Sequence, residues 1–243
     1  MPYDKKSFLA GVALGRQLKG WATGGSGGGP TPPEPLSHYT VLDYISSSGA
    51  QYIDTCIYVK PTYTVSVTMR LNGSYTTWDT FFGTRDTNAA SSGASRFTFR
   101  FHNTENSAEW QRSIDTSGRY ESKGLSSARQ IFQSFHQVGI SNRYAMLDNS
   151  IYYTFDKATK EPLFPYTIYL FALHSQGIVT DYSHSDFKEG YILDETGNTL
   201  ADYIPVQRKS DGAVGLFDKV TSTFMENSGT GVFTPHYLDT NNV

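Results

Sequence analysis

Two groups of side chains have the residue types that a carbohydrate site needs. Sugars present apolar C–H faces ringed by hydroxyl groups, so a site for them combines exposed aromatic rings with hydrogen-bonding side chains. The two groups are Trp78 with Asp79 and Arg85, and Trp110 with Arg112 and Tyr120. A second interpretation stays open, in which Trp78 belongs to the core and Trp110 only anchors its loop. Both groups are therefore candidates for ligand binding.

Catalysis is not expected, because the sequence lacks paired carboxylates in a suitable spacing. A retaining glycoside hydrolase needs two carboxylates about 5–5.5 Å apart. On one strand they would stand at i and i+2 or i+4, facing the same way, and no E-x-D-x-E run exists. The acids fall where solvated loops are expected, namely Glu105, Glu109 and Asp115 in the polar stretch 102–124, and Asp194 and Glu195 in a turn. We expect a protein that is not an enzyme.

No metal or cofactor is expected either. The six histidines are scattered, and only His174 and His184 could approach Asp181 or Asp186 around a loop at 174–188, without the spacing of a zinc site. Calcium stays open, because carboxylate and carbonyl ligands leave weak traces in a sequence. A G-x-S-x-G match at 24–28 lacks the preceding strand and following helix of a nucleophile elbow.

The composition indicates one large all-β domain. The 243 residues include 17 Tyr and 15 Phe with frequent glycine, and only 18% are charged, which suits many short strands joined by turns. The net charge of −3 argues against a nucleic-acid partner, because backbone binding needs clustered Lys and Arg. Cys56 is the single cysteine, so no disulfide forms within the chain and a reducing cytoplasm fits.

Strands are predicted from period-two alternation. The apolar residues Val65, Val67, Met69 and Leu71 alternate with polar ones, and the three phenylalanines at 97, 99 and 101 do the same. Further strands are expected at 51–58, 79–84, 131–141, 144–148, 151–155, 166–173, 189–194, 200–208, 213–218 and 230–234. No amphipathic helix is expected between 36 and 243. This pattern predicts an antiparallel two-sheet sandwich or jelly roll.

The stretch 198–234 is expected to close the sheet as a hairpin. Asp211-Gly212 lies between two apolar runs, and a tight turn needs the positive φ that glycine adopts readily. Pro205 should lie on an edge strand or at a bulge, because proline donates no ladder hydrogen bond.

The N-terminal residues are predicted to form an anchor and a tether. Residues 4–21 read as a short helix with an apolar stripe, and 22–35 as a Gly-rich and then Pro-rich linker. Such a helix is marginal alone, so its stripe either packs on its own domain or docks onto another protein. The linker favours docking, through Phe8, Leu9, Val12, Leu14, Leu18 and Trp21. Arg16 and Lys19 interrupt the apolar run, so neither a signal peptide nor a spanning helix is expected.

Three blocks carry a resemblance to a known family. The stretch 42–55, LDYISSSGAQYIDT, the strand YLFA at 169–172, and the stretch 202–233, DYIPVQRKSDGAVGLFDKVTSTFMENSGTGVF, resemble in that order the opening, late and closing motifs of concanavalin A-like, laminin-G-like jelly-roll domains. Such domains occur in virion and tail-associated proteins of bacteriophages and prophages of gut bacteria. This chain departs from the family in having Cys56 where the opening motif usually has glycine, which should affect only the local backbone.

The resemblance implies a curved two-sheet sandwich that commonly binds glycans or proteins, usually without catalysis. With the predicted anchor, it implies a virion protein, made in the bacterial cytoplasm, that docks onto capsid or tail partners. There it would be present in many copies or as a homo-oligomer and display a lectin-like domain toward glycans or host surface proteins. The alternative is a purely structural decoration or fibre protein with no ligand of its own.

Overall fold

The fold was analysed in a computed structural model that describes residues 35–73, 78–86, 96–102, 105–113, 120–141, 143–155 and 166–239. The predicted N-terminal helix at 4–21, with its six docking residues, lies outside the described residues. The predicted linker at 22–35 also lies outside them, apart from Pro35. Both stay predictions.

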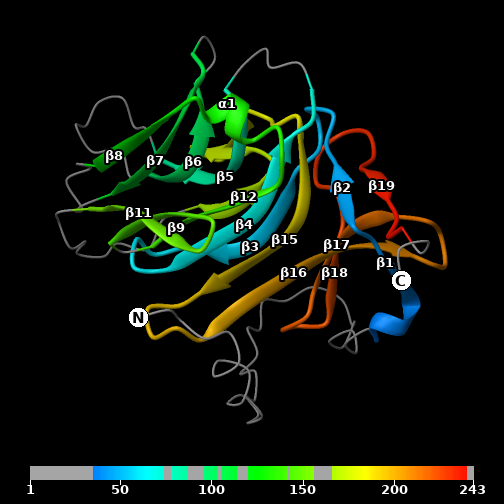
Figure 1. The fold of residues 1–243 in the computed structure, drawn as a ribbon. Coiled ribbons are helices and arrows are strands. Elements are labelled where there is room, and N and C mark those ends of the chain that lie inside the picture. The colour runs from blue at the N-terminus through cyan, green and yellow to red at the C-terminus, as the bar shows by residue number, and fades with distance from the viewer. Residues whose placement is uncertain are drawn as a thin grey trace. The chain divides into compact units, whose positions relative to one another are not determined.

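The described residues form two β-sheets (Figure 1). The larger sheet has 11 strands: β1 (Tyr39–Val41), β2 (Tyr44–Ser46), β4 (Thr64–Leu71), β9 (His136–Ile140), β10 (Tyr144–Leu147), β11 (Ser150–Thr154), β15 (Ser185–Leu193), β16 (Thr199–Arg208), β17 (Val214–Asp218), β18 (Thr223–Met225) and β19 (Thr234–His236). The smaller sheet has 8 strands: β3 (Ile53–Tyr58), β5 (Thr80–Arg85), β6 (Arg96–Phe101), β7 (Ser107–Ser113), β8 (Tyr120–Ser126), β12 (Thr167–Leu170), β13 (Leu173–Ser175) and β14 (Ile178–Thr180).

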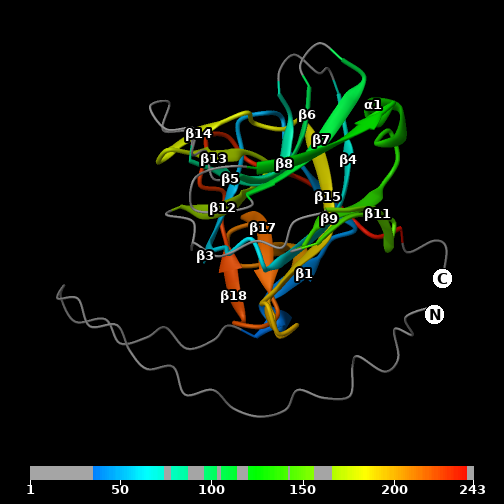
Figure 2. The ribbon, with the colours of Figure 1, turned by 90° about the vertical axis from the view of Figure 1, so that its left-hand side faces the viewer.

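The two sheets are separate layers around one apolar core. In Figure 2, β5, β12 and β13 lie on one side and β4, β9 and β15 on the other. The alternating apolar side chains of β4 and β6 are fully or almost fully buried, as period-two alternation requires of a strand that covers a core. Among the described strands, every pair is antiparallel except β13 beside β5. The predicted all-β, two-sheet antiparallel sandwich is confirmed.

The closing hairpin is also confirmed. Strands β16 and β17 pair antiparallel, and Gly212 in the turn has a φ of 76°. Pro205, however, lies inside β16, which has neighbours on both sides. It stands between the last residue paired with β15, Tyr203, and the first paired with β1, Val206. At this point the neighbour of β16 changes from β15 to β1, so no backbone N–H is needed there for strand pairing. The Pro205 carbonyl accepts a hydrogen bond from Leu42 N–H at 3.0 Å.

The two resemblance blocks at 42–55 and 202–233 contact each other in the fold. The Ser228 amide donates to Tyr52 O at 2.9 Å, and the Thr230 amide donates to Ala50 O at 3.0 Å. In return Tyr52 N–H donates to the Asn227 side-chain oxygen at 3.1 Å. The resemblance blocks at 42–55 and 202–233 therefore form one structural unit.

The largest correction concerns the stretch 102–124, which was predicted to be a long loop. It contains all of β7 and the start of β8. The inward-facing residues of β7 are Ala108, Trp110 and Arg112, and an arginine on the buried side hides the apolar alternation that signals a strand.

Four predicted strands have different limits. The strand expected at 131–141 begins at His136, because α1 (Ala128–Ile131) precedes it. The strand expected at 166–173 is divided into β12 and β13 at Phe171, whose φ is 67°. The strand expected at 189–194 begins at Ser185, and that at 230–234 begins at Thr234. In the described part of the chain, the helices are α1 and the 3₁₀ turn η1 (Leu36–His38), and none could span a membrane.

Candidate ligand-binding face

The outer face of the smaller sheet carries a cluster of polar side chains. Because β6 turns its phenylalanines toward the core, Arg96, Thr98 and Arg100 lie on the opposite face. Across β7, Glu109 pairs with Arg100 and Gln111 pairs with Thr98. Arg85 at the end of β5 stands directly opposite Arg96. We call the group Arg85, Arg96, Arg100, Glu109 and Gln111 the arginine face.

Hydrogen bonds join most of this face. Arg100 Nη2 lies 3.1 Å from Glu109 Oε1, and its Nη1 lies 3.8 Å from Asp181 Oδ2. Gln111 donates to the same Glu109 oxygen at 2.5 Å and accepts from Arg96 Nη1 at 3.2 Å. These bonds hold Arg100 and Glu109 in fixed positions with little exposure to water.

Two aromatic rings flank the arginines. The Arg100 guanidinium carbon lies 4.3 Å from the ring centroid of Trp78, whose ring also contacts His102 at 4.9 Å between centroids. The Arg96 guanidinium carbon lies 4.0 Å from the ring centroid of Tyr120, which is 41% exposed. Both arrangements are cation–π contacts, and they orient the two guanidinium planes.

The charges on this face are partly withdrawn from water. Desolvation lowers the pKa of Arg85 and of Arg96, and the positive charge of Arg100 lowers both further. Burial raises the pKa of Asp181, against the opposing effect of Arg100 and Arg85. Arg85 Nε and Arg96 Nε are buried atoms with no hydrogen-bond partner. The face thus keeps unused donors in a site of reduced water access.

Three of the six predicted ligand-binding residues lie at this face: Trp78, Arg85 and Tyr120. Sequence reasoning missed Arg96, Arg100 and Gln111. The signal for the two arginines was available in RFTFRF, where they alternate with the core phenylalanines on one strand. That these residues contact a ligand stays a prediction.

The other three predicted residues are fully buried, which corrects their assignment. Trp110 packs in the core, with its ring 4.9 Å from Phe99 and 5.0 Å from Tyr152. Trp110 is therefore a core residue of β7.

Asp79 and Arg112 hold the fold together. Asp79 accepts from the backbone N–H of His184 at 2.9 Å and lies 3.4 Å from Arg129 Nη1. Arg112 lies on the core side of β7 with its Nη2 2.9 Å from Glu121. Neither side chain is exposed to a ligand.

The histidine and acid residues around 174–188 do not converge. His174 Nδ1 lies 2.9 Å from Thr167 O, and His184 contacts Asp79. Asp186 accepts from Ser46, Arg70 and Asn72. Within the described residues, no three His, Cys, Asp or Glu side chains form a group that could hold a metal ion.

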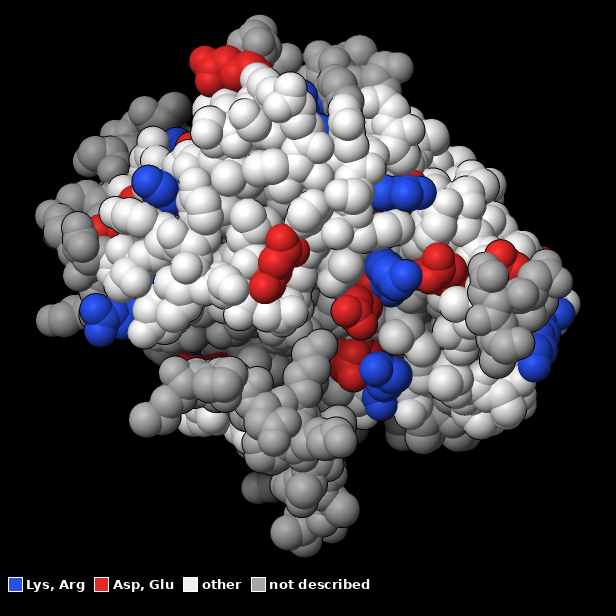
Figure 3. All heavy atoms as spheres, in the orientation of Figure 1, with Lys and Arg blue, Asp and Glu red and all other residues white. Residues whose placement is uncertain are grey.

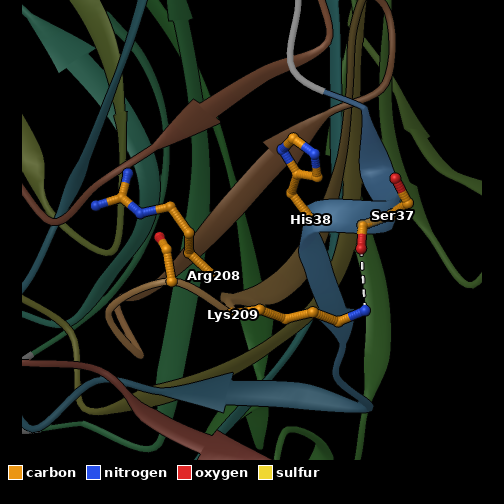
Figure 4. A pocket seen from close by; sticks show the side chains of 5 residues that line it. Ser37, His38, Arg208 and Lys209 are labelled. Atoms are coloured by element: carbon orange, nitrogen blue, oxygen red, sulfur yellow. Dashed lines mark hydrogen bonds between the residues drawn. The ribbon is translucent and has the colours of Figure 1, made fainter.

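An open hollow of about 450 Å³ lies between η1 and the β16–β17 turn (Figure 4). Its two basic side chains leave the turn in opposite directions, and both are engaged. Arg208 lies 2.6 Å from both Asp211 and Glu226, and Lys209 Nζ donates to Ser37 O at 2.9 Å. The hollow is therefore a poorer candidate than the arginine face.

On the side of the molecule drawn in Figure 3, charges do not gather by sign. Figure 3 shows one side of the molecule, where basic and acidic side chains are scattered among uncharged ones and several lie beside a partner of opposite sign. Ion pairs such as Lys188 with Asp43 and Lys219 with Asp202 contribute to this pattern.

Comparisons with known proteins add little beyond the architecture. No family model matches the chain, and no curated protein matches it. Among solved structures, the chain is similar to domains LG4-5 of the mouse laminin alpha1 chain, with 13% identity and a TM-score of 0.41. The match covers 77% of this chain and 51% of that one, so the chain spans about half the length of this structure.

Proposed function

We propose that this protein is a binding module whose jelly-roll domain recognises glycans through the arginine face. The observation that carries the proposal is the partial burial of three arginines beside each other, flanked by Trp78 and Tyr120. Desolvating charge costs stability, and two carboxylates, Glu109 and Asp181, do not balance three cations. A ligand that supplies acceptors to these donors would explain why the chain maintains such a face.

We further propose that the module is displayed on a phage virion. The support is the resemblance of the stretches 42–55 and 202–233 to opening and closing motifs, respectively, of phage-encoded domains, together with the predicted anchor and linker. Many copies on one particle would raise the effective concentration of sites, so that modest affinity at each site suffices for attachment. Enzymatic activity is not part of the proposal.

Binding of the full-length protein to envelope polysaccharides from gut bacteria tests the recognition proposal. Trp78→Ala and Arg100→Gln should each weaken binding by about tenfold, because Trp78 orients Arg100 through a cation–π contact and Arg100 supplies charge to the face, each effect being worth roughly 1–3 kcal/mol. Arg143→Gln is the matched control, since Arg143 is exposed and lies outside the arginine face. Unchanged binding by both Trp78→Ala and Arg100→Gln would favour the alternative, a structural decoration protein with no ligand of its own.

Incorporation into particles tests the display proposal. Deleting residues 1–21 should prevent incorporation while leaving the unfolding temperature of the β domain unchanged, because the described core uses none of these residues. The substitution Leu14→Asp in the predicted apolar stripe should have the same effect, and Lys5→Gln is its control. Normal incorporation of the truncated protein would falsify docking through this segment.

A further inference from the structure

We infer that the arginine face binds an anionic group of a saccharide, a carboxylate, sulfate or phosphate, between Arg85 and Arg96. This inference rests on the proposed function and names its ligand class. It starts from the cross-strand pair itself: Arg85 on β5 stands opposite Arg96 on β6, and like charges in this position repel. An anion seated between them would convert the repulsion into two attractions.

Neither arginine of this pair forms a close ion pair with a carboxylate among the described residues, although Asp181 attracts Arg85 and Glu109 attracts Arg96 over a longer distance. Arg85 contacts the Ser175 hydroxyl at 3.5 Å, and Arg96 contacts the Gln111 amide oxygen at 3.2 Å. The Nε–H groups of both are buried without an acceptor. The planar guanidinium fork matches the paired oxygens of a carboxylate, sulfate or phosphate. Because the Nε–H groups are buried, an anion would meet the Nη groups of the two arginines.

Arg100 has a different role, because its charge is already balanced. Its guanidinium lies between Glu109 at 3.1 Å and Asp181 at 3.8 Å, which leaves Arg85 and Arg96 as the two arginines of the face without a close ion pair among the described residues. Arg100 lowers the pKa of both arginines of the pair, whereas Asp181 raises the pKa of Arg85 and Glu109 raises the pKa of Arg96. The case for an anion therefore rests on the cross-strand pair itself.

The aromatic rings support the same ligand class. A neutral sugar would stack its C–H face on an open ring, but guanidinium groups already lie over Trp78 and Tyr120. The contact with Tyr120 holds the Arg96 guanidinium in one orientation, which lowers the entropy lost when an anion binds. The face is thus organised around charge more than around ring stacking.

The experiment compares two acidic polysaccharides with their neutral counterparts, using the full-length protein. The probes are polygalacturonate against its carboxyl-reduced form, and dextran sulfate against dextran. At least one acidic probe should bind about tenfold or more tightly than its neutral counterpart, and added salt should weaken that binding. The two acidic probes distinguish a carboxylate from a sulfate as the preferred group.

Variants then locate the site. Arg85→Gln and Arg96→Gln should each weaken binding of the preferred acidic probe by about tenfold, whereas the control Arg143→Gln should change it by less than about twofold. Arg85→Lys should recover only part of the loss, because lysine keeps the charge but lacks the planar fork. Unfolding temperatures of all variants show whether each remains folded.

Three outcomes would overturn the inference: equal binding of acidic and neutral probes, no binding of either acidic probe, or full binding by both glutamine variants. Each is distinguishable from failure of the proposed function. If envelope polysaccharide still binds and Trp78→Ala still weakens that binding, the proposed recognition module stands and only its preference for anions is wrong.

Discussion

At the scale of single residues, Cys56 is the clearest case of a side chain at odds with its backbone. Its φ is 56°, in the left-handed region that favours glycine, and the surrounding β3 is bulged against β12. The resemblance places a glycine here, and Cys56 adopts a glycine-like φ. The thiol is exposed, and its contact with Asp54 O, 3.9 Å away, is weak.

Replacing Cys56 by glycine should therefore stabilise the domain. A non-glycine residue in this conformation costs roughly 1–2 kcal/mol, and the greater chain entropy of unfolded glycine offsets part of the gain, leaving about 0.5–1 kcal/mol. Urea unfolding measures the change. Cys56→Ser is the control because it keeps the strain, and an equal gain in that variant would show that the backbone is not the cause.

At the scale of elements, the turn between β15 and β16 depends on one carboxylate. Asp194 Oδ1 accepts from the amides of Thr196 and Asn198, each at 2.9 Å, and from the Thr196 hydroxyl at 2.7 Å. Slight burial acts to raise the pKa of Asp194, but these hydrogen bonds outweigh it and lower the pKa to about 2. The charged form of the side chain thus stabilises the hairpin.

Asp194→Asn should lower the free energy of unfolding at pH 7 by about 1 kcal/mol, a value reduced for solvent screening. Because the pKa is depressed on folding, the wild-type advantage is present above pH 4 and is lost as pH falls toward 2. Urea unfolding of both proteins across this range measures it. Glu195→Gln, which removes only the surface ion pair with Lys60 at 3.0 Å, should have a smaller effect. A pH-independent difference for Asp194→Asn would contradict the electrostatic explanation.

At the scale of the whole molecule, packing between the sheets decides stability. Trp110 of β7 contacts Phe99 of β6 and also Tyr152 of β11, which belongs to the other sheet. Phe132, just after α1, packs at 5.3 to 5.5 Å between ring centroids against Phe81, Phe99 and Phe101. This aromatic cluster fills the space between the layers.

Trp110→Ala should destabilise the protein by about 3–5 kcal/mol, because removal of a buried indole leaves a cavity. The loss should fall toward the lower end, since the indole N–H has no hydrogen-bond partner in the fold. Thermal unfolding measures it, with Trp78→Ala as the comparison that should change the midpoint little. If the Trp110→Ala protein kept its stability but no longer bound glycan, the assignment of Trp110 to the core would be wrong and Trp110 would be a binding residue.

Much of the architecture could be predicted because it depends on local pattern. Alternation in VSVTMRL and RFTFRF places apolar side chains on one face of a strand whatever the neighbours are, and Asp211-Gly212 supplies the conformation that a tight turn requires. The stretch around β7 escaped prediction because both of its faces carry charge, Arg112 toward the core and Glu109 away from it.

The candidate site was only half predictable for a related reason. Trp78 and Trp110 each have an arginine close in sequence, and nothing local distinguishes the half-buried ring from the fully buried one. Likewise Asp79 looks like a ligand-binding carboxylate until Arg129 and His184, far away in the chain, are found beside it.

By itself, then, the sequence determined that this chain builds an antiparallel sandwich closed by the 198–234 hairpin, because strand alternation and turn chemistry act over a few residues. Only the tertiary structure decided which polar groups meet: Arg85 with Arg96 across β5 and β6, Arg100 between Glu109 and Asp181, and the amides of Ser228 and Thr230 with Tyr52 and Ala50. Those partners are distant in sequence, and their contact depends on strand register and on how the core places the layers.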